Sequence, residues 1–297
     1  MTDRRREIVV LRAGWLTTIQ DGGRPGLAHL AVPHSGAVDT KSWRLANRIV
    51  GNPEDEAALE TTLTGVTIQP SVDCSVAVTG AQALITLDGR HASWGLPLYV
   101  KAGQILDIGP ATAGVRNYVA ISGGIDVPLV LRSRSTDILS GLGPPPLSDG
   151  QIFALGPVKA PAAVVDFAPY PNPPTHLNLL LHIGPRNDWL TDTAQLSLSR
   201  EIWHVGTNSN RIALRLDGAS LKRSKAGELP SEGIVSGAVQ VPPDGQPLIF
   251  LADHPTTGGY PVVGVIDQSD LAACGQAGPG IAVSFRVVSN HSQIRST

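Results

Sequence analysis

Hydrophobic and polar positions alternate with period two in several short runs, which is the pattern of a half-buried β-strand. In the run 211–216, isoleucine and leucine alternate with arginine and alanine. Glycine, proline, asparagine or aspartate bounds the runs, so the strands are expected to be joined by turns. The predicted strands are 75–79, 83–87, 104–108, 116–121, 177–183, 211–216, 247–251 and 281–288.

Helical periodicity is rare and is clearest at residues 40–50, where side chains of one helix face recur at the i, i+3, i+4, i+7 spacing. Asp39 is a good N-cap because its carboxylate accepts the free amides of the first turn, and Gly51 suits a left-handed end. Two shorter helices are predicted at 188–197 and 269–274. The pattern predicts a mainly β protein with few short helices, built as barrels or sandwiches.

Prolines are concentrated in one stretch, which we interpret as a linker between two domains. Proline fixes φ and stiffens the chain, so residues 156–176 are expected to separate a domain at 1–155 from a domain at 177–297. A chain of 297 residues is long enough for two domains. The prolines of this stretch are Pro157, Pro161, Pro169, Pro171, Pro173 and Pro174.

Composition supports strands and argues against two classes of partner. The 32 glycines and 24 prolines disfavour a helical bundle, since both residues break helices. A formal net charge of −2 gives no attraction to nucleic acid or anionic membranes, and 4% aromatic residues leave few side chains for stacking bases. No apolar run approaches the ~18 residues of a membrane span, and a cytoplasmic chain is expected.

Several motifs of nucleotide, metal and nucleophile chemistry are absent from the sequence. It has no Gly-Lys phosphate loop, HExxH, CxxC or GxSxG motif. Met1 is the only methionine, so the Met-Lys-Met context of a biotinylated lysine is absent too. Cys74 and Cys274 lie in apolar stretches and are expected to be buried thiols, so no metal site is predicted. ATP or biotin, if used, is expected to come from another chain.

The first of four polar clusters is a turn at Gly22-Gly23, which allows positive φ. The turn is expected to bring Asp21 and Arg24 together, with Gln20 as a neutral donor and acceptor. An arginine fork suits a carboxylate or a carbamate-like group of a substrate. The alternative is a hairpin turn with a surface ion pair.

The second cluster runs into the predicted helix at 40–50. Free amides at a helix N-terminus attract anions, and His34 and Ser35 lie just upstream, where they would face such a ligand. The alternative is capping by Asp39, which would occupy those amides. The third cluster, 133–137, follows an apolar strand and combines the hydroxyls of Ser133, Ser135 and Thr136 with the fork donor Arg134 and the carboxylate of Asp137, and its alternative is a solvated loop.

The fourth cluster, 253–261, follows a predicted strand. Gly258 and Gly259 can turn backbone amides inward as an anion nest, with Tyr260 held beside them. Asp253 and the next residue, a histidine, cannot be assumed to form a dyad, because strand neighbours point to opposite faces. The alternative is a β-turn with a packed tyrosine.

Longer motifs connect these clusters along nearly the whole chain. They are 18–21 with Arg24 and Gly26, Pro33 with 35–37 and Asp39, 46–47 with 51–52, 123–124 with 127–128, 133–137, 209–211 with 215–216, 240–247, Asp253, 256–261, 270–271, Gln276 and 279–280. On these motifs the chain resembles the KipA family, also called allophanate hydrolase subunit 2 or the C-type subunit of bacterial 5-oxoprolinase. It is also similar to the carboxyltransferase region of biotin-dependent urea carboxylase.

The resemblance implies two cyclophilin-like β-barrel domains and pairing with a KipI-like chain, which is the B-type subunit of 5-oxoprolinase or allophanate hydrolase subunit 1. In 5-oxoprolinase a lactam-utilisation chain, the A-type subunit, completes the ATP-dependent opening of 5-oxoproline to glutamate. In urea carboxylase the equivalent region receives carboxybiotin. No cofactor bound covalently to this chain is implied, while ATP or carboxybiotin would act through a partner.

With the resemblance, the clusters become candidate site residues. Asp21, Arg24, Asp253 and Tyr260 are expected to be catalytic. Those expected to bind a small amide substrate are Gln20, His34, Ser35, Arg134, Ser135, Thr136, Thr256, Thr257, Gly258 and Gly259. The Asp253–Tyr260 loop and the Gln20–Arg24 turn are expected to line one cleft.

The sequence departs from the family at three places. Arg132 stands where the family usually has glycine, residues 143–146 replace a glycine-rich stretch, and Ile212 and Ala213 replace Met-Gly. Three functions stay open: a 5-oxoprolinase-type hydrolase subunit inactive alone, a carboxyltransferase or allophanate hydrolase component of a urea-utilising system, and a KipI-binding regulator without enzymatic activity.

Overall fold

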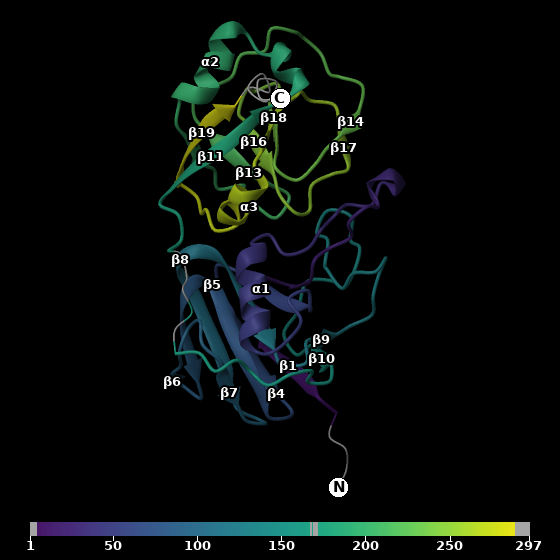
Figure 1. The fold of residues 1–297 in the computed structure, drawn as a ribbon, viewed down its shortest axis with the longest axis vertical. Coiled ribbons are helices and arrows are strands. Elements are labelled where there is room, and N and C mark those ends of the chain that lie inside the picture. Colours follow the sequence, from purple (N-terminus) through teal and green to yellow (C-terminus); the bar gives the residue numbers. More distant parts are fainter. Residues whose placement is uncertain (1–4, 167, 169–171, 289–297) are drawn as a thin grey trace, which may run out of the picture. The chain divides into compact units, whose positions relative to one another are not determined.

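The computed structural model describes residues 5–166, 168 and 172–288, and the chain divides into two compact units. The first unit is Met1–Arg24 with Ser35–Pro173, and the second is Pro25–His34 with Pro174–Thr297 (Figure 1). The division after Pro173 falls within the stretch predicted to be a linker, of which Pro169 and Pro171 lie outside the described residues. Earlier parts of that stretch join the first unit, since Ala163 N donates to Ile49 O at 2.9 Å.

One ten-stranded antiparallel sheet forms the first unit, with the order β2-β3-β8-β4-β1-β10-β9 and with β5 pairing β6, β7 and β8. The strands are β1 (Glu7–Arg12), β2 (Leu16–Gln20), β3 (Ala58–Thr62), β4 (Val66–Pro70), β5 (Cys74–Leu87), β6 (Arg90–His91), β7 (Leu98–Val100), β8 (Leu106–Ile121), β9 (Ile125–Asp126) and β10 (Ile152–Leu155).

Two pairs of predicted strands are each one long strand. The predicted strands 75–79 and 83–87 are joined in β5, and 104–108 and 116–121 are joined in β8. The pairing register of β5 with β8 shifts near Gly80, whose φ of +89° places it against the carbonyl of Arg116. Such bulges bend a strand without ending it, so turn-forming residues do not mark the end of a strand here.

Opposite faces of this sheet bury different cores. Alternate residues such as Ile19, Leu59 and Val119 lie in the larger apolar core, while Ala58 and Tyr118 lie on the other face, in the apolar cluster that contains residues of helix α1 (Thr40–Ile49). The helix prediction at 40–50 is confirmed, and so is its cap, because the Asp39 carboxylate accepts from Ser42 N at 3.1 Å.

A closed seven-stranded barrel forms the second unit, with the order β11-β18-β15-β16-β13-β12-β19 and a parallel closure between β11 and β19. Its elements are β11 (His176–Ile183), α2 (Asp192–Arg200), β12 (Trp203–Val205), β13 (Ala213–Asp217), β14 (Glu232–Gly233), β15 (Ala238–Gln240), β16 (Leu248–Phe250), β17 (Thr257–Gly258), β18 (Val262–Ile266), α3 (Gln268–Cys274) and β19 (Ala282–Val288). The strands β14 and β17 form a separate two-stranded ribbon.

Two predicted boundaries in this unit are wrong. The predicted helix 188–197 is split into a 3₁₀ turn, Pro185–Trp189, and α2, because Thr191 is extended and caps α2 through its hydroxyl. The predicted strand 211–216 begins later, at Ala213. Asn210 Oδ1 accepts from Ile212 N at 2.7 Å and forms a side-chain turn that ends only where β13 starts.

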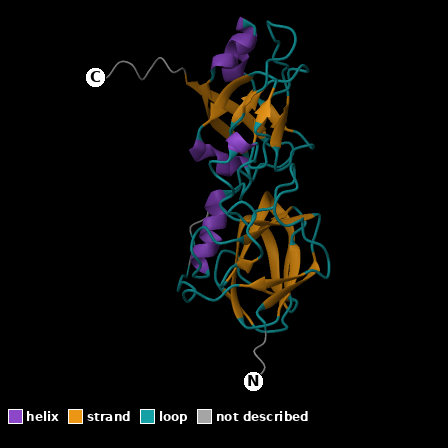
Figure 2. Ribbon diagram, turned by 90° about the vertical axis from the view of Figure 1, so that its right-hand side faces the viewer, coloured by secondary structure: helices purple, strands orange, loops and turns teal. Residues whose placement is uncertain are grey.

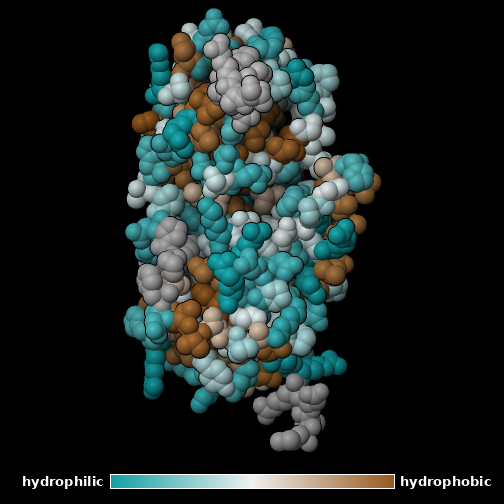
Figure 3. Space-filling view, in the orientation of Figure 1, coloured by the Kyte–Doolittle hydropathy of each residue, from teal (hydrophilic) through white to brown (hydrophobic). Residues whose placement is uncertain are grey.

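The prediction of a mainly β fold with few short helices is confirmed. Strands dominate both units, and the described residues form three α-helices of ten residues or fewer (Figure 2). On the face drawn in Figure 3, apolar side chains are interspersed with polar ones. Within the described residues, no helix is long and apolar enough to cross a membrane.

Candidate functional site

Asp21 lies in a turn directly after β2 and organises the segment 133–135. Its Oδ1 accepts from Gly23 N at 2.8 Å and from the hydroxyls of Ser133 and Ser135 at 2.6 Å each. Its Oδ2 accepts from Arg134 N at 2.6 Å. With four protein donors around one carboxylate, Asp21 fixes the position of this loop.

Arg24 is 2% exposed and holds the same loop from the other side. Its Nε donates to Val130 O at 3.0 Å, its Nη1 to Ser35 Oγ at 3.1 Å and its Nη2 to Ser135 O at 2.7 Å. Protein oxygens therefore take at least three of its five N–H donors. The alternative of a surface ion pair is wrong because this guanidinium is buried.

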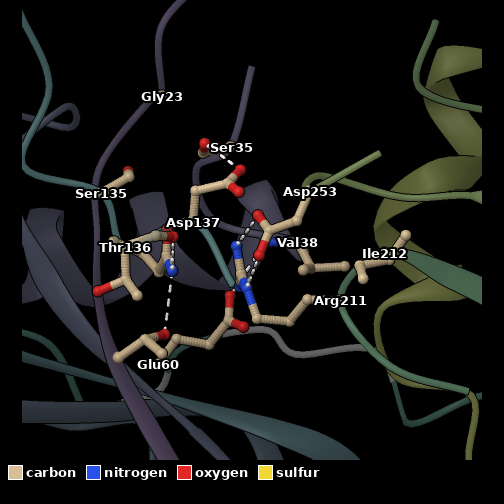
Figure 4. A network of polar contacts seen from close by, with 12 residues as sticks. Gly23, Ser35, Val38, Glu60, Ser135, Thr136, Asp137, Arg211, Ile212 and Asp253 are labelled. Atoms are coloured by element: carbon tan, nitrogen blue, oxygen red, sulfur yellow. Dashed lines mark hydrogen bonds and ion pairs between the residues drawn. The ribbon is translucent and has the colours of Figure 1, made fainter. Parts of the chain in front are cut away.

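The hydroxyl of Ser35 lies between a guanidinium and a carboxylate. It accepts from Arg24 and donates to Asp137 Oδ2 at 2.7 Å (Figure 4). The other oxygen of Asp137 accepts from Leu139 N at 3.0 Å and Ser140 N at 2.6 Å. Ser35 itself has a φ of +57°, a conformation that costs a non-glycine residue free energy and is frequent at functional sites.

The segment 133–137 is not a solvated loop. Ser133, Ser135, Thr136 and Asp137 are each at most 1% exposed. Thr136 N donates to Ile19 O at 2.9 Å, so the segment runs along the edge of β2. The structure thus brings the predicted residues Gln20, Asp21, Arg24, Ser35 and Ser135 into one buried polar cluster, together with Thr136 and the backbone of Arg134.

Acceptors from the protein occupy the amides at the start of α1. Val38 N donates to Glu60 Oε2 at 3.0 Å, Asp39 N to Tyr118 Oη at 2.7 Å, and Ser42 N to the Asp39 carboxylate. This is what the capping alternative predicts. His34, expected to face an anion here, belongs to the second unit and is exposed.

Glu60 is a buried carboxylate in the middle of β3. Its Oε2 also accepts from the Tyr118 hydroxyl at 2.7 Å, and its Oε1 lies 3.5 Å from Arg116 Nε. Burial, followed by the charge of Glu60, raises the pKa of Tyr118 well above its ordinary value. The Tyr118 hydroxyl therefore stays protonated and acts as a donor to Glu60.

In the second unit, Asp253 and Arg211 form a bidentate ion pair. Arg211 Nε and Nη2 donate to the two carboxylate oxygens at 2.9 Å each, and the side chains are 1% and 0% exposed (Figure 4). The backbone repeats the contact, since Asp253 N donates to Arg211 O at 3.1 Å. A buried pair of this geometry holds the loop after β16 firmly against the start of β13.

Residues 256–260 form a ribbon. Thr257 and Gly258 make up β17 and pair with Gly233 and Glu232 of β14, and Glu232 forms an ion pair with Arg186. Neither Gly258 nor Gly259 has positive φ, so the backbone lacks the left-handed residue that an anion nest needs.

The side chains of this ribbon are only partly covered. Thr257 is exposed, and Thr256 and Tyr260 are half-buried. Gln240 Nε2 donates to Tyr260 O at 3.1 Å and fixes the end of the ribbon. The carbonyl of Tyr260 is therefore held while its side chain stays partly accessible, as a residue that faces a ligand would be.

Residues 30–287 match the family described as carboxyltransferase domain, subdomain A and B. The chain belongs to the carboxyltransferase domain family. Among its relatives is the 5-oxoprolinase C-type subunit of Escherichia coli, 37% identical over 279 residues that cover 93% of this chain and 89% of that protein. The 5-oxoprolinase C-type subunit of Haemophilus influenzae is 34% identical over 92% of this chain and 88% of that protein.

Longer members of the carboxyltransferase family contain a similar region. Urea amidolyase of Saccharomyces cerevisiae is 35% identical over 96% of this chain, which covers 17% of that protein. The crystal structure of TTHA0988 superposes with a TM-score of 0.85 at 32% identity over 95% of this chain and 56% of that chain. The K. lactis urea amidolyase structure superposes with a TM-score of 0.88 at 30% identity, over 97% of this chain and 19% of that chain. The chain thus spans little more than half of one solved relative and a fifth of the other.

Four residues of this carboxyltransferase-family chain were not among the candidates from sequence: Glu60, Tyr118, Asp137 and Arg211. Glu60 is a charged residue in the middle of a buried strand. A buried charge is unusual and points to a specific role, but the alternation of hydrophobic and polar residues does not reveal it. The carboxylate of Asp137 belongs to the third polar cluster but was not chosen as a site residue, and Arg211 lies inside a motif that carries the family resemblance.

Within the described residues, no group of three or more metal-binding side chains forms. The two polar clusters lie in different units, so the expectation that the Gln20–Arg24 turn and the Asp253–Tyr260 loop line one cleft stays a prediction. Chemically, the first cluster offers a polarised hydroxyl and fixed carboxylates, and the second offers the exposed residue Thr257 and the half-buried Tyr260 on a fixed ribbon.

Proposed function

We propose that the chain is the C-type subunit of an ATP-dependent 5-oxoprolinase-type complex, which opens 5-oxoproline to glutamate. One observation supports this choice: the alignment with the C-type subunit of E. coli 5-oxoprolinase covers most of both proteins, at 93% and 89%. The urea amidolyase match covers 17% of a much longer enzyme. Agreement over two nearly whole chains favours the role of a separate subunit.

The chemistry is divided between chains in this proposal. This sequence has no nucleotide-binding motif, so ATP would bind to a partner, a lactam-utilisation chain, while a KipI-like B-type chain would assemble with this one. The complex would act in the cytoplasm on a small amide and would need no nucleic acid or membrane. Carboxybiotin would reach this chain only through a partner.

We assign the candidate residues two kinds of role. Asp21, Arg24 and Asp253 are positioning residues, because protein groups surround their charged ends. Thr257, which is exposed, and Tyr260, which is half-buried, would touch the substrate from a fixed ribbon. Arg24 is therefore a poor choice for a test of catalysis, since its removal would release the 130–137 loop.

The test is reconstitution with the B-type and lactam-utilisation chains, following glutamate and ADP from 5-oxoproline and ATP. We expect turnover only with all chains present. Tyr260→Phe should lower the rate by roughly tenfold or more if its hydroxyl contacts the reacting group. Tyr99→Phe, the same change at an exposed tyrosine of the other unit, is the matched control and should leave the rate unchanged. Full activity of this chain alone would refute the proposal.

A carboxyltransferase role in a urea-utilising system is the second candidate. The match to the carboxyltransferase domain family and the TM-score of 0.88 to K. lactis urea amidolyase favour it. It predicts carboxylation of urea by a biotin carboxylase system that includes this chain. If the chain binds its KipI-like partner and neither reaction occurs, a regulatory role would replace both.

A further inference from the structure

Gln20 carries a buried acceptor that no described group of the protein uses. The side chain is 0% exposed, and its Oε1 has no hydrogen-bond partner among the described residues. Nearly all buried polar atoms in proteins are paired with protein or water, so such an atom marks either a bound water or a ligand position. The hydroxyl of Thr136, 1% exposed, is likewise without a partner in this part of the chain.

The orientation of the Gln20 amide is fixed by its other end. Nε2 donates to Thr18 Oγ1 and to Thr136 O, at 3.0 Å each. Turning the amide over would place Oε1 against the carbonyl of Thr136, and two acceptors repel. The network therefore assigns the unpartnered atom as an oxygen, which can only accept a hydrogen bond.

The unpartnered oxygen of Gln20 is matched to a hydrogen-bond donor, because an amide oxygen only accepts. Gln20 pairs with Ala58 and therefore lies on the sheet face opposite Ile19 and the apolar core. Thr18, two residues before it on the same face, pairs with Glu60 on the adjacent strand. An amide N–H supplies the donor that this oxygen needs, whereas the oxygen atoms of an ester or a carboxylate supply none.

We propose that Gln20 Oε1 accepts the N–H of the substrate amide, a lactam or urea-type group, and so distinguishes an amide from an ester. Only the identity of the lactam, 5-oxoproline, rests on the proposed function. A site built around a buried acceptor rejects an analogue without the donor, because the acceptor is then left unpaired. A bound water at Oε1 would give no such selectivity.

The test compares two ligands of nearly identical shape by calorimetry on the assembled complex. They are 5-oxoproline and its lactone analogue, 5-oxotetrahydrofuran-2-carboxylate, in which oxygen replaces the N–H. We expect the wild-type complex to bind the lactam roughly 10- to 100-fold more tightly. Equal binding of the two ligands would overturn the inference.

Variants locate the acceptor. Gln20→Met should bind both ligands with the affinity of the lactone, and retained selectivity would show that another group reads the N–H. If Gln20→Met does not fold, Gln20→Asn withdraws the acceptor by one methylene and should lose selectivity too. Gln69→Met is the matched control: it makes the same change at a glutamine of β4 outside this cluster, whose Nε2 donates to Gly103 O at 2.7 Å, so selectivity should be kept.

The inference and the proposed function can fail separately. Turnover of 5-oxoproline without selectivity over the lactone would refute the inference and leave the function intact. If 5-oxoproline is neither bound nor hydrolysed, the function fails, and urea against tetramethylurea, which has no N–H, tests the acceptor. Equal binding of that pair would then overturn the inference.

Discussion

Arg132 occupies a backbone conformation that its side chain disfavours. Val130 and Ser133 exchange both backbone hydrogen bonds, and the two residues between them, Leu131 and Arg132, have φ of +51° and +69°. A turn with two positive φ values normally uses asparagine and glycine. The relatives' glycine at this position, expected from the family resemblance, therefore has a physical explanation, and Arg132 carries strain that the fold overcomes.

Replacing Arg132 by glycine should stabilise the protein. The left-handed conformation costs a non-glycine residue ~1–2 kcal/mol, and the greater entropy of unfolded glycine offsets part of this gain. We expect a net increase of about 0.5–1 kcal/mol in the free energy of unfolding, measured by urea denaturation. Arg90→Gly, at an exposed strand arginine without positive φ, should instead destabilise. A lower stability of Arg132→Gly would contradict the explanation.

At the scale of elements, the start of α1 is tied to the sheet by one tyrosine. Tyr118 on β8 donates to Glu60 on β3 and accepts from Asp39 N, the N-cap residue of the helix. Three segments distant in the sequence therefore meet at one hydroxyl. The helix would form its own cap without the hydrogen bond from Asp39 N to Tyr118. Its position on the sheet depends on that hydrogen bond.

Tyr118→Phe should lower the free energy of unfolding by about 2 kcal/mol, because it leaves a buried carboxylate and a buried amide each short of a partner. Because its folded pKa is raised, the tyrosine contributes fully below about pH 10. Its contribution declines at higher pH, where unfolded tyrosine ionises. Denaturant curves at about pH 7 and pH 11 should show the difference from wild type shrinking, and Tyr99→Phe should show almost none. If Tyr118→Phe leaves the free energy of unfolding unchanged at neutral pH, a water molecule has replaced the lost hydroxyl.

On the scale of the whole molecule, each unit carries one buried thiol. Burial raises the pKa of Cys74 in the first unit to about 11 and that of Cys274 in the second unit to about 12. The thiolate is the reactive form, and burial disfavours it. Both thiols therefore stay protonated in the folded protein well above neutral pH.

Neither thiol should react with an aromatic disulfide reagent at about pH 8 while the protein is folded, and both should react in guanidinium chloride. Because the two cysteines lie in different units, mass spectrometry of peptides labelled at intermediate denaturant would report which unit opens. The free-thiol count in denaturant is the control for oxidation. Rapid labelling of either cysteine in native protein would contradict its burial.

Features that depend on local pattern could be predicted without the fold. Alternation indicated most of the strands, Asp39 and the helical spacing indicated α1, and ordered motifs indicated the family. Where local pattern failed, the reason was geometric: β5 continues through a bulge at Gly80, and β13 starts late because Asn210 forms a side-chain turn. Neighbouring residues alone do not decide whether a turn residue ends a strand or bends it.

The roles of the polar residues, by contrast, became clear only from the fold. Asp21 and Arg24 are three residues apart, and this spacing predicted a turn that binds a ligand. In the structure, the donors and acceptors that surround their side chains come largely from residues 130–135. Glu60 and Tyr118 meet because β3 and β8 are neighbours, and Arg211 reaches Asp253 across 42 positions. A polar side chain's role depends on which partners the fold brings within about 3 Å, and sheet pairing between distant segments sets those partners.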